Sequence, residues 1–74
     1  MTDMEKKIAE LKEQGYRKND TYEVYESASG LQVIQVFTSN WGFEEWRYTM
    51  KGEVIDAYQI SLYSAPRKIF EKRA

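Results

Sequence analysis

Cysteine and histidine are both missing from the 74-residue sequence. Without cysteine, neither a disulfide framework nor a thiolate metal site can form. Without histidine, the commonest general base and the commonest transition-metal ligand are absent too. We therefore expect no metal and no cofactor, and nucleophile–base pairs built on Cys or His are excluded.

Long hydrophobic runs are also missing. Apolar stretches such as "VIQVF" fall far below the roughly 18 residues that indicate a membrane-spanning helix. The first residues, "MTDMEKKIAEL", mix acidic and basic groups where a signal peptide would have an apolar region. The sequence therefore predicts a cytoplasmic protein with no membrane partner.

Glycine is sparse, and the sequence has a single proline. The four glycines, at 15, 30, 42 and 52, stand alone, so there is no glycine-rich loop to hold a phosphate. Glu44 and Glu45 are adjacent, and in a strand they would point to opposite faces instead of sharing a substrate. A Ser–Lys pair at Ser64 is better explained as a helix cap. We expect a protein that is not an enzyme.

What the chain does have is apolar and aromatic content. Hydrophobic residues make up 42% and aromatic residues 15%, which predicts a folded chain, and the length suits one compact domain over residues 1–74. Charge is uneven: residues 19–63 carry seven acidic and two basic groups, whereas residues 64–74 carry one acidic and four basic groups. This pattern differs from the broad basic surface of a duplex-binding domain.

The first segment predicts a helix over residues 3–14. Thr2 and Glu5 have the spacing of a capping box. Apolar residues follow at helical spacing, and Gly15 suits the left-handed position that ends a helix.

The middle of the chain predicts four antiparallel strands, near residues 21–27, 31–38, 43–50 and 53–60. If Ser29 and Gly30 are the central residues of a two-residue turn, Tyr22 lies beside Phe37; a longer loop would shift this register by one and exchange the faces.

A two-residue turn at Lys51-Gly52 would place Trp46 opposite Ala57, Arg47 opposite Asp56 and Tyr48 opposite Ile55. Trp46, Tyr48 and Met50 would then share the buried side. A helix over residues 53–63 is the competing assignment, which the β-branched and aromatic residues disfavour.

The end of the chain, "SAPRKIFEKRA", predicts a short helix with Ser64 as its cap and Pro66 in its first turn. The predicted fold is therefore α+β, in the order α-β-β-β-β-α. A four-stranded antiparallel meander would carry the N- and C-terminal helices on one face, because two apolar stripes need one surface to bury against.

Binding is the function class that remains. We expect a small accessory domain of a bacterium or phage that binds an unknown protein partner through aromatic residues of the sheet and of the 39–43 loop. The candidate partner-binding residues are Trp41, Phe43, Tyr58 and Arg47. Trp41 is either a lid over the end of the core or an exposed anchor.

Two further interpretations stay open. Single-stranded nucleic acid would stack its bases on the sheet aromatics and place its phosphates near Arg47 and the basic C-terminal helix. The acidic middle of the chain disfavours this alternative. A homodimer is the other, because a domain this small gains stability by covering exposed aromatic residues or a strand edge.

Overall fold

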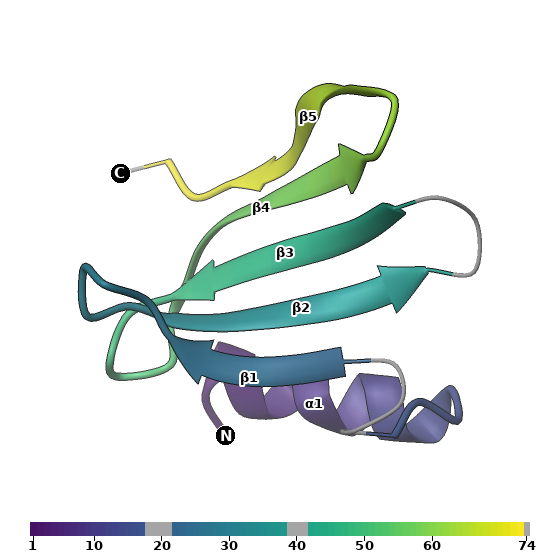
Figure 1. Ribbon diagram of the computed structural model, residues 1–74. Helices are drawn as coiled ribbons and strands as arrows, with labels where there is room; N and C mark the ends of the chain where they lie inside the picture. The colour runs from purple at the N-terminus through teal and green to yellow at the C-terminus, as the bar shows by residue number, and fades with distance from the viewer. Residues whose placement is uncertain (18–21, 39–41, 74) are drawn as a thin grey trace.

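The computed structural model describes residues 1–17, 22–38 and 42–73. One helix and five strands make up the fold: α1 (Asp3–Glu13), β1 (Tyr22–Glu26), β2 (Gln32–Thr38), β3 (Gly42–Tyr48), β4 (Val54–Ser61) and β5 (Ser64–Glu71). The strands form a single antiparallel sheet in the order β1-β2-β3-β4-β5, so each strand pairs with its neighbours in the chain (Figure 1). Within the described ranges, no helix is long and apolar enough to cross a membrane.

Helix α1 begins and ends close to where the sequence predicts. The Glu5 amide donates to the Thr2 hydroxyl at 3.2 Å, and that hydroxyl donates to the Glu5 carboxylate at 3.1 Å. At the other end, Gly15 has a φ of 90°, and the Tyr16 amide donates to the Leu11 carbonyl at 3.0 Å. Both ends of the helix are therefore capped, as the pattern indicates.

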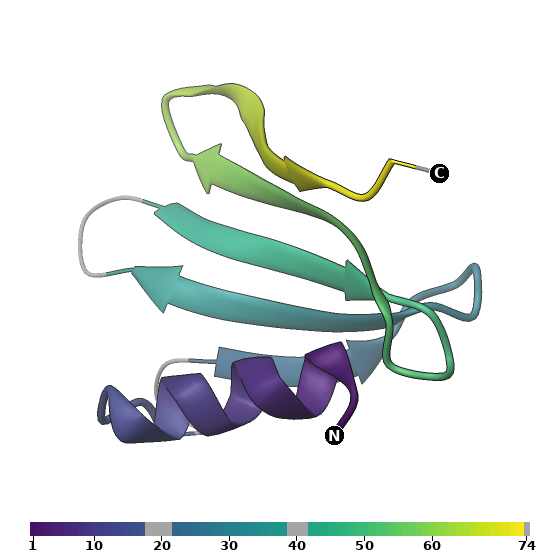
Figure 2. The same cartoon turned by 180° about the vertical axis from the view of Figure 1, so that it is seen from behind.

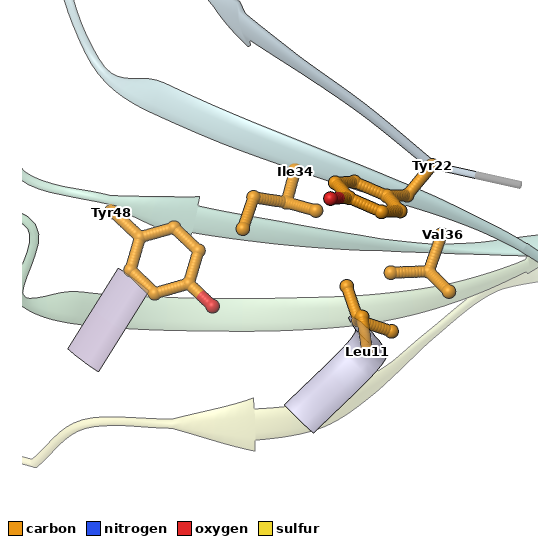
Figure 3. Packing of buried hydrophobic residues seen from close by; sticks show 5 residues of the cluster. All are labelled: Leu11, Tyr22, Ile34, Val36 and Tyr48. Carbon is orange, nitrogen blue, oxygen red and sulfur yellow. The ribbon is translucent and has the colours of Figure 1, made fainter. Parts of the chain in front are cut away.

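The core lies between α1 and the first three strands. Its centre consists of Leu11, Tyr22, Ile34, Val36 and Tyr48, each at most 3% exposed (Figure 3). These side chains come from α1, β1, β2 and β3. The apolar stripe of the helix is thus buried against one side of this half of the sheet.

The start of α1 is also attached to the turn between β3 and β4. The Met4 amide donates to the Gly52 carbonyl at 2.9 Å, and the Asp3 carboxylate accepts from the Val54 amide at 3.1 Å. Gly52 has a φ of 84°, and a Cβ at this position would lie 2.8 Å from the Thr2 side chain. A glycine is therefore required here both for its backbone conformation and for the space it leaves.

The predicted C-terminal helix and the four-stranded meander are wrong. Ser64–Glu71 forms a fifth strand, β5, which pairs with β4, and the described residues contain no helix after α1. Phe70 stacks on Trp46 with ring centroids 5.8 Å apart, so β5 covers a ring that would otherwise be more exposed. Pro66 is compatible with this assignment because β5 is an edge strand, where a missing amide hydrogen is tolerated.

The predicted register of the first hairpin is wrong by one residue. Tyr22 pairs with Val36, not with Phe37. The Ser27 amide donates to the Leu31 carbonyl, which encloses a three-residue loop ending in Gly30, whose φ is 79°. This is the longer loop that exchanges the faces of the strand, and it places Phe37 on the side away from α1.

The strand assignment of residues 53–60 and part of the second register are confirmed. β4 spans Val54–Ser61, Trp46 pairs with Ala57, and Arg47 pairs with Asp56. Trp46 and Ala57 lie on the side of α1, where Ala57 is fully buried and Trp46 packs against the edge of the core.

The register departs from the prediction nearer the turn. Tyr48 pairs with Val54 and not with Ile55, because the ladder is irregular after Arg47. The Thr49 amide donates to the Glu53 carbonyl, so this hairpin also closes through a three-residue loop with a left-handed glycine last. Met50 falls within that loop and is 59% exposed, which corrects its prediction as a buried residue.

The single helix covers only part of the sheet. In both views α1 lies along the β1 side, while β4 and β5 extend away from it (Figures 1 and 2). An antiparallel sheet of five strands is about 19 Å wide between its edge strands, whereas a helix with its side chains is about 10 Å across. Among the described residues, no helix or further strand covers the opposite side of the sheet.

Candidate functional site

The side of the sheet that faces away from α1 is the candidate site, and we call it the open face. Side chains alternate along a strand, so the neighbours of the core residues Tyr22, Ile34 and Tyr48 point to this side. The strand pairings identify the members of the open face: Glu23, Tyr25, Val33, Gln35, Phe37, Phe43, Glu45, Arg47, Asp56, Tyr58, Ile60, Lys68 and Glu71.

These side chains form three rows that run across the strands. The apolar row is Phe37, Phe43 and Ile60; the second row is Glu23, Gln35, Glu45, Tyr58 and Lys68; the third row is Tyr25, Val33, Arg47, Asp56 and Glu71. The apolar row lies at the end of the sheet where β2 connects to β3. The charged residues occupy the other two rows.

The apolar row presents aromatic surface to solvent. The rings of Phe37 and Phe43 are tilted by 46° with centroids 6.0 Å apart, a common geometry for an aromatic pair. Phe37 is 40% exposed, and Phe43 and Ile60 are half-buried. At the same end of the sheet, the β4–β5 turn exposes Leu62 and Tyr63 by 72% and 79%.

Glu45 is the centre of a polar network in the second and third rows. Its carboxylate accepts from the Tyr25 hydroxyl at 2.9 Å and from Arg47 Nε and Nη2 at 3.1 and 3.0 Å, with Gln35 Nε2 at 3.5 Å. Burial opposes ionisation, but the hydrogen bonds from Tyr25, Arg47 and Gln35 outweigh it and hold the pKa of Glu45 below its ordinary value. Glu45 is thus an ionised carboxylate at neutral pH.

The network continues from Arg47 to β4 and β5. Arg47 Nε lies 3.9 Å from Asp56 Oδ1, a buried oxygen with no hydrogen-bond partner among the described residues. The Arg47 guanidinium also lies over the Tyr58 ring at 4.8 Å, and Lys68 Nζ lies 5.6 Å from the same ring. Two carboxylates therefore share one guanidinium, which is bound closely to only one of them.

Tyr25, Glu45 and Arg47 have protonation states that their surroundings hold fixed around neutral pH. Burial and the hydrogen bond to Glu45 raise the pKa of the Tyr25 hydroxyl, so it stays protonated. Burial works against the charge of Arg47, but Glu45, Asp56 and Tyr58 raise its pKa overall. Each of these three groups therefore holds one charge state around neutral pH.

A hollow of about 390 Å³ opens on the same face, beside the loop that joins β1 to β2. Its lining includes Tyr25, Leu31, Val33 and Arg47. The open face therefore has a partly exposed aromatic pair at one end and a concave region at the other. Its formal charges are four acidic residues against two basic ones.

Three of the four predicted partner-binding residues come together on the open face. Phe43, Arg47 and Tyr58 belong to adjacent strands, with Arg47 packed over the Tyr58 ring. Trp41, and with it the question of lid or anchor, lies outside the described residues.

The candidate partner-binding residues predicted from the sequence did not include Tyr25, Phe37, Ile60 and Glu45. For Phe37 the missing information was the register of the first hairpin, because a shift of one residue moves it from beside Tyr22 to the open face. Gly30 was the available signal, since a left-handed glycine at the third loop position predicts a three-residue loop.

A second aromatic group lies on the side of α1. Trp46 donates through Nε1 to the Glu44 carboxylate at 3.1 Å, Lys7 Nζ lies 4.2 Å from its ring, and Phe70 stacks on it. Each of these contacts is internal to the domain. Trp46 is therefore a structural residue that joins α1, β3 and β5.

No protein-family model, curated protein or solved structure matches the chain.

Proposed function

We propose that this domain is a non-enzymatic binding module, and that its open face receives a protein partner. The observation that supports this most strongly is the partly exposed pair of Phe37 and Phe43, at the end of a sheet face on which the described part of the chain forms no second layer. Aromatic side chains are enriched at protein interfaces because they bury a large area with little loss of rotamer freedom. Contiguous exposed apolar surface rimmed by polar groups is typical of such interfaces.

The polar rows would give the interface its specificity. Glu45 and Arg47 are held in fixed positions by their mutual hydrogen bonds, so they can meet a partner without ordering first. The acidic and basic groups of this face favour a partner whose charges have a complementary order.

The proposal is tested by capture from an extract of the native host, followed by rebinding of the purified partner. Phe37→Ser should lose the partner, because it removes exposed aromatic surface without touching the core. Met50→Ser is the matched control: Met50 is 59% exposed but lies in the β3–β4 loop, away from the apolar row. Trp41→Ala tests the contribution of the 39–43 loop in parallel.

The same partner bound equally by wild type, Phe37→Ser and Met50→Ser would contradict an open-face site. Circular dichroism of each variant separates loss of binding from loss of folding.

Single-stranded nucleic acid is the second candidate. Arg47 and Lys68 lie on the same face as Tyr25, Phe37 and Phe43, so bases and phosphates would have adjacent partners. The basic segment is an edge strand and not a helix, and the acidic groups of this face oppose the phosphates. Anisotropy of a labelled oligonucleotide at low ionic strength tests this candidate, since true phosphate binding weakens steeply with salt.

We also infer a cytoplasmic location, because the absence of cysteine removes any dependence on an oxidising compartment.

A further inference from the structure

We infer that the occupant of the open face is the open face of a second copy of this chain. The two copies would form a symmetric dimer whose two-fold axis lies between the sheets and runs parallel to β3. This inference rests on the proposed function, since it takes the open face to be a protein-binding surface. Two observations support the dimer: the order of charges along the second row, and the position of the apolar row.

The strand order determines what such an axis brings together. β3 is the middle strand of the five, so rotation about an axis along β3 places β1 over β5 of the second copy and β2 over its β4. A side chain keeps its height along the strand direction, so each row meets the same row of the partner. Sheets packed face to face in aligned sandwiches keep their strands within about 30° of each other, which preserves this matching.

The apolar row then meets another apolar row. Phe43 lies next to the axis, and Phe37 on β2 comes over Ile60 on β4 of the second copy. The exposed part of Phe37 is thereby removed from water, together with the half-buried surfaces of Phe43 and Ile60.

The two ends of the second row are complementary in charge. Its β1 end is Glu23 and its β5 end is Lys68, so rotation about β3 sets Glu23 against Lys68 in two symmetry-related places. Both side chains are exposed. Lys68 Nζ lies 3.3 Å from the Glu71 carboxylate of its own chain, so in the dimer Glu23 of the second copy would share the lysine with Glu71. Near the axis, Glu45 would meet its own copy in the second row, and Arg47 would meet its own copy in the third row. Within each chain these two groups are paired at 3.0 Å, which offsets both like-charge contacts.

The small size of the core gives the dimer a physical role. Five residues form its centre, all of them in α1 and the first three strands, and the sequence has no cysteine to cross-link the remainder. Small domains without a disulfide or metal commonly gain stability by oligomerisation. The open face has fewer residues than the roughly 20–30 that each partner contributes to a standard interface. We therefore expect a weak dimer with a Kd on the order of micromolar.

Sedimentation velocity of the full chain over a range of concentrations tests the dimer. The wild type is compared with variants in which the charge of Glu23 or of Lys68 is reversed. Glu23→Lys puts lysine against lysine, and Lys68→Glu puts glutamate against glutamate. Each single variant should dimerise roughly tenfold or more weakly than wild type, because two attractive pairs become repulsive. An equimolar mixture of the two single variants should restore association, and so should the double variant E23K/K68E.

Lys6→Glu is the matched control, because Lys6 is exposed on α1 and far from the open face. It should leave association unchanged. Circular dichroism checks that each variant is folded. Restored association in the mixture would also show that both single variants are folded.

The inference is overturned if wild type remains a monomer up to roughly millimolar concentration. It is also overturned if the single variants associate as strongly as wild type, or if the mixture and the double variant fail to recover. A monomeric wild type that still captures another protein in a Phe37-dependent way would reject the dimer and leave the proposed binding function intact.

Discussion

Glu45 is the residue on which the polar network of the open face depends. It accepts hydrogen bonds from both Tyr25 and Arg47, and its side chain is only 15% exposed. A lowered pKa in the folded state means that the ionised form stabilises the fold. This contribution is fully present above the ordinary pKa of about 4.3, and it is lost as the pH falls through the lower, folded-state value.

Replacement of Glu45 by glutamine removes that contribution. At pH 7 we expect the free energy of unfolding to fall by about 1–3 kcal/mol, because charge-assisted hydrogen bonds are replaced by neutral ones. In acid, once the wild-type carboxylate has become protonated, the difference should largely disappear. Urea unfolding at both pH values measures this, with the exposed helix residue Glu13→Gln as control; a difference that persists unchanged in acid would disprove the ionic explanation.

The burial of Tyr48 leads to a prediction about unfolding at alkaline pH. It is 1% exposed, and burial together with the nearby charges of Asp3 and Glu10 raises its pKa well above the ordinary value of about 10. The neutral phenol therefore stabilises the fold, and this stability is lost as the pH rises above the ordinary pKa.

Tyr48→Phe should leave stability at pH 7 nearly unchanged and move the midpoint of alkaline unfolding to higher pH. Circular dichroism during a base titration gives the midpoint. Tyr63→Phe, at a side chain that is 79% exposed, should leave that midpoint in place. Equal shifts in the two variants would show that burial of Tyr48 is not the cause.

At the scale of the elements, the contribution of the contact between α1 and the β3–β4 turn to stability can be measured by replacing two glycines, one at a time, with alanine. Gly30 and Gly52 have similar left-handed backbones, with φ of 79° and 84°, but only Gly52 lacks room for a Cβ. Gly30→Ala should cost about 1 kcal/mol, since it adds only the strain of a side chain in that conformation. Gly52→Ala should cost about 1–3 kcal/mol more, because Thr2 and the start of α1 must move.

Chemical denaturation of the two variants gives both values. Equal costs at the two positions would mean that the close approach of Thr2 contributes nothing to stability.

The helix and the second hairpin could be predicted from the sequence because their signals are local. The Thr2–Glu5 cap and Gly15 determine the ends of α1, and alternation around Trp46 determines which side of β3 faces the core. The registers near both loops could not be predicted from a two-residue turn. Each loop closes over three residues with a left-handed glycine last, and the choice between these turns depends on how the strands pack.

The end of the chain shows why the predicted C-terminal helix was wrong. "SAPRKIF" carries a plausible cap and a proline in the first turn, so local propensity favours a helix. The stacking of Phe70 on Trp46 and the pairing with β4 are contacts between residues distant in sequence, which local patterns do not report. Propensity is a weak prior that tertiary contacts override. With that strand misassigned, Lys68 could not be recognised as part of the open face.

For the molecule as a whole, the position of the core predicts an order of local stability. The centre of the core is contributed by α1 and the first three strands, whereas β5 is exposed at every residue except Phe70. Amide hydrogen exchange of the monomer should therefore be slowest in β2 and β3 and fastest in β5, since exchange follows the free energy of local opening. Protection in β5 equal to that in β2 would contradict this order.

The attachment of α1 to Gly52 and Val54 also bears on how the chain folds. Every strand pairs with a neighbour in the chain, so the sheet can assemble by extending one hairpin after another. Such local closures are entropically cheap and favour fast folding. The hydrogen bonds from Met4 to Gly52 and from Val54 to Asp3 instead join residues separated by nearly the whole length of the helix and three strands. We therefore expect helix docking to be the slow, topologically demanding step, completed only after the β3–β4 turn exists to receive it.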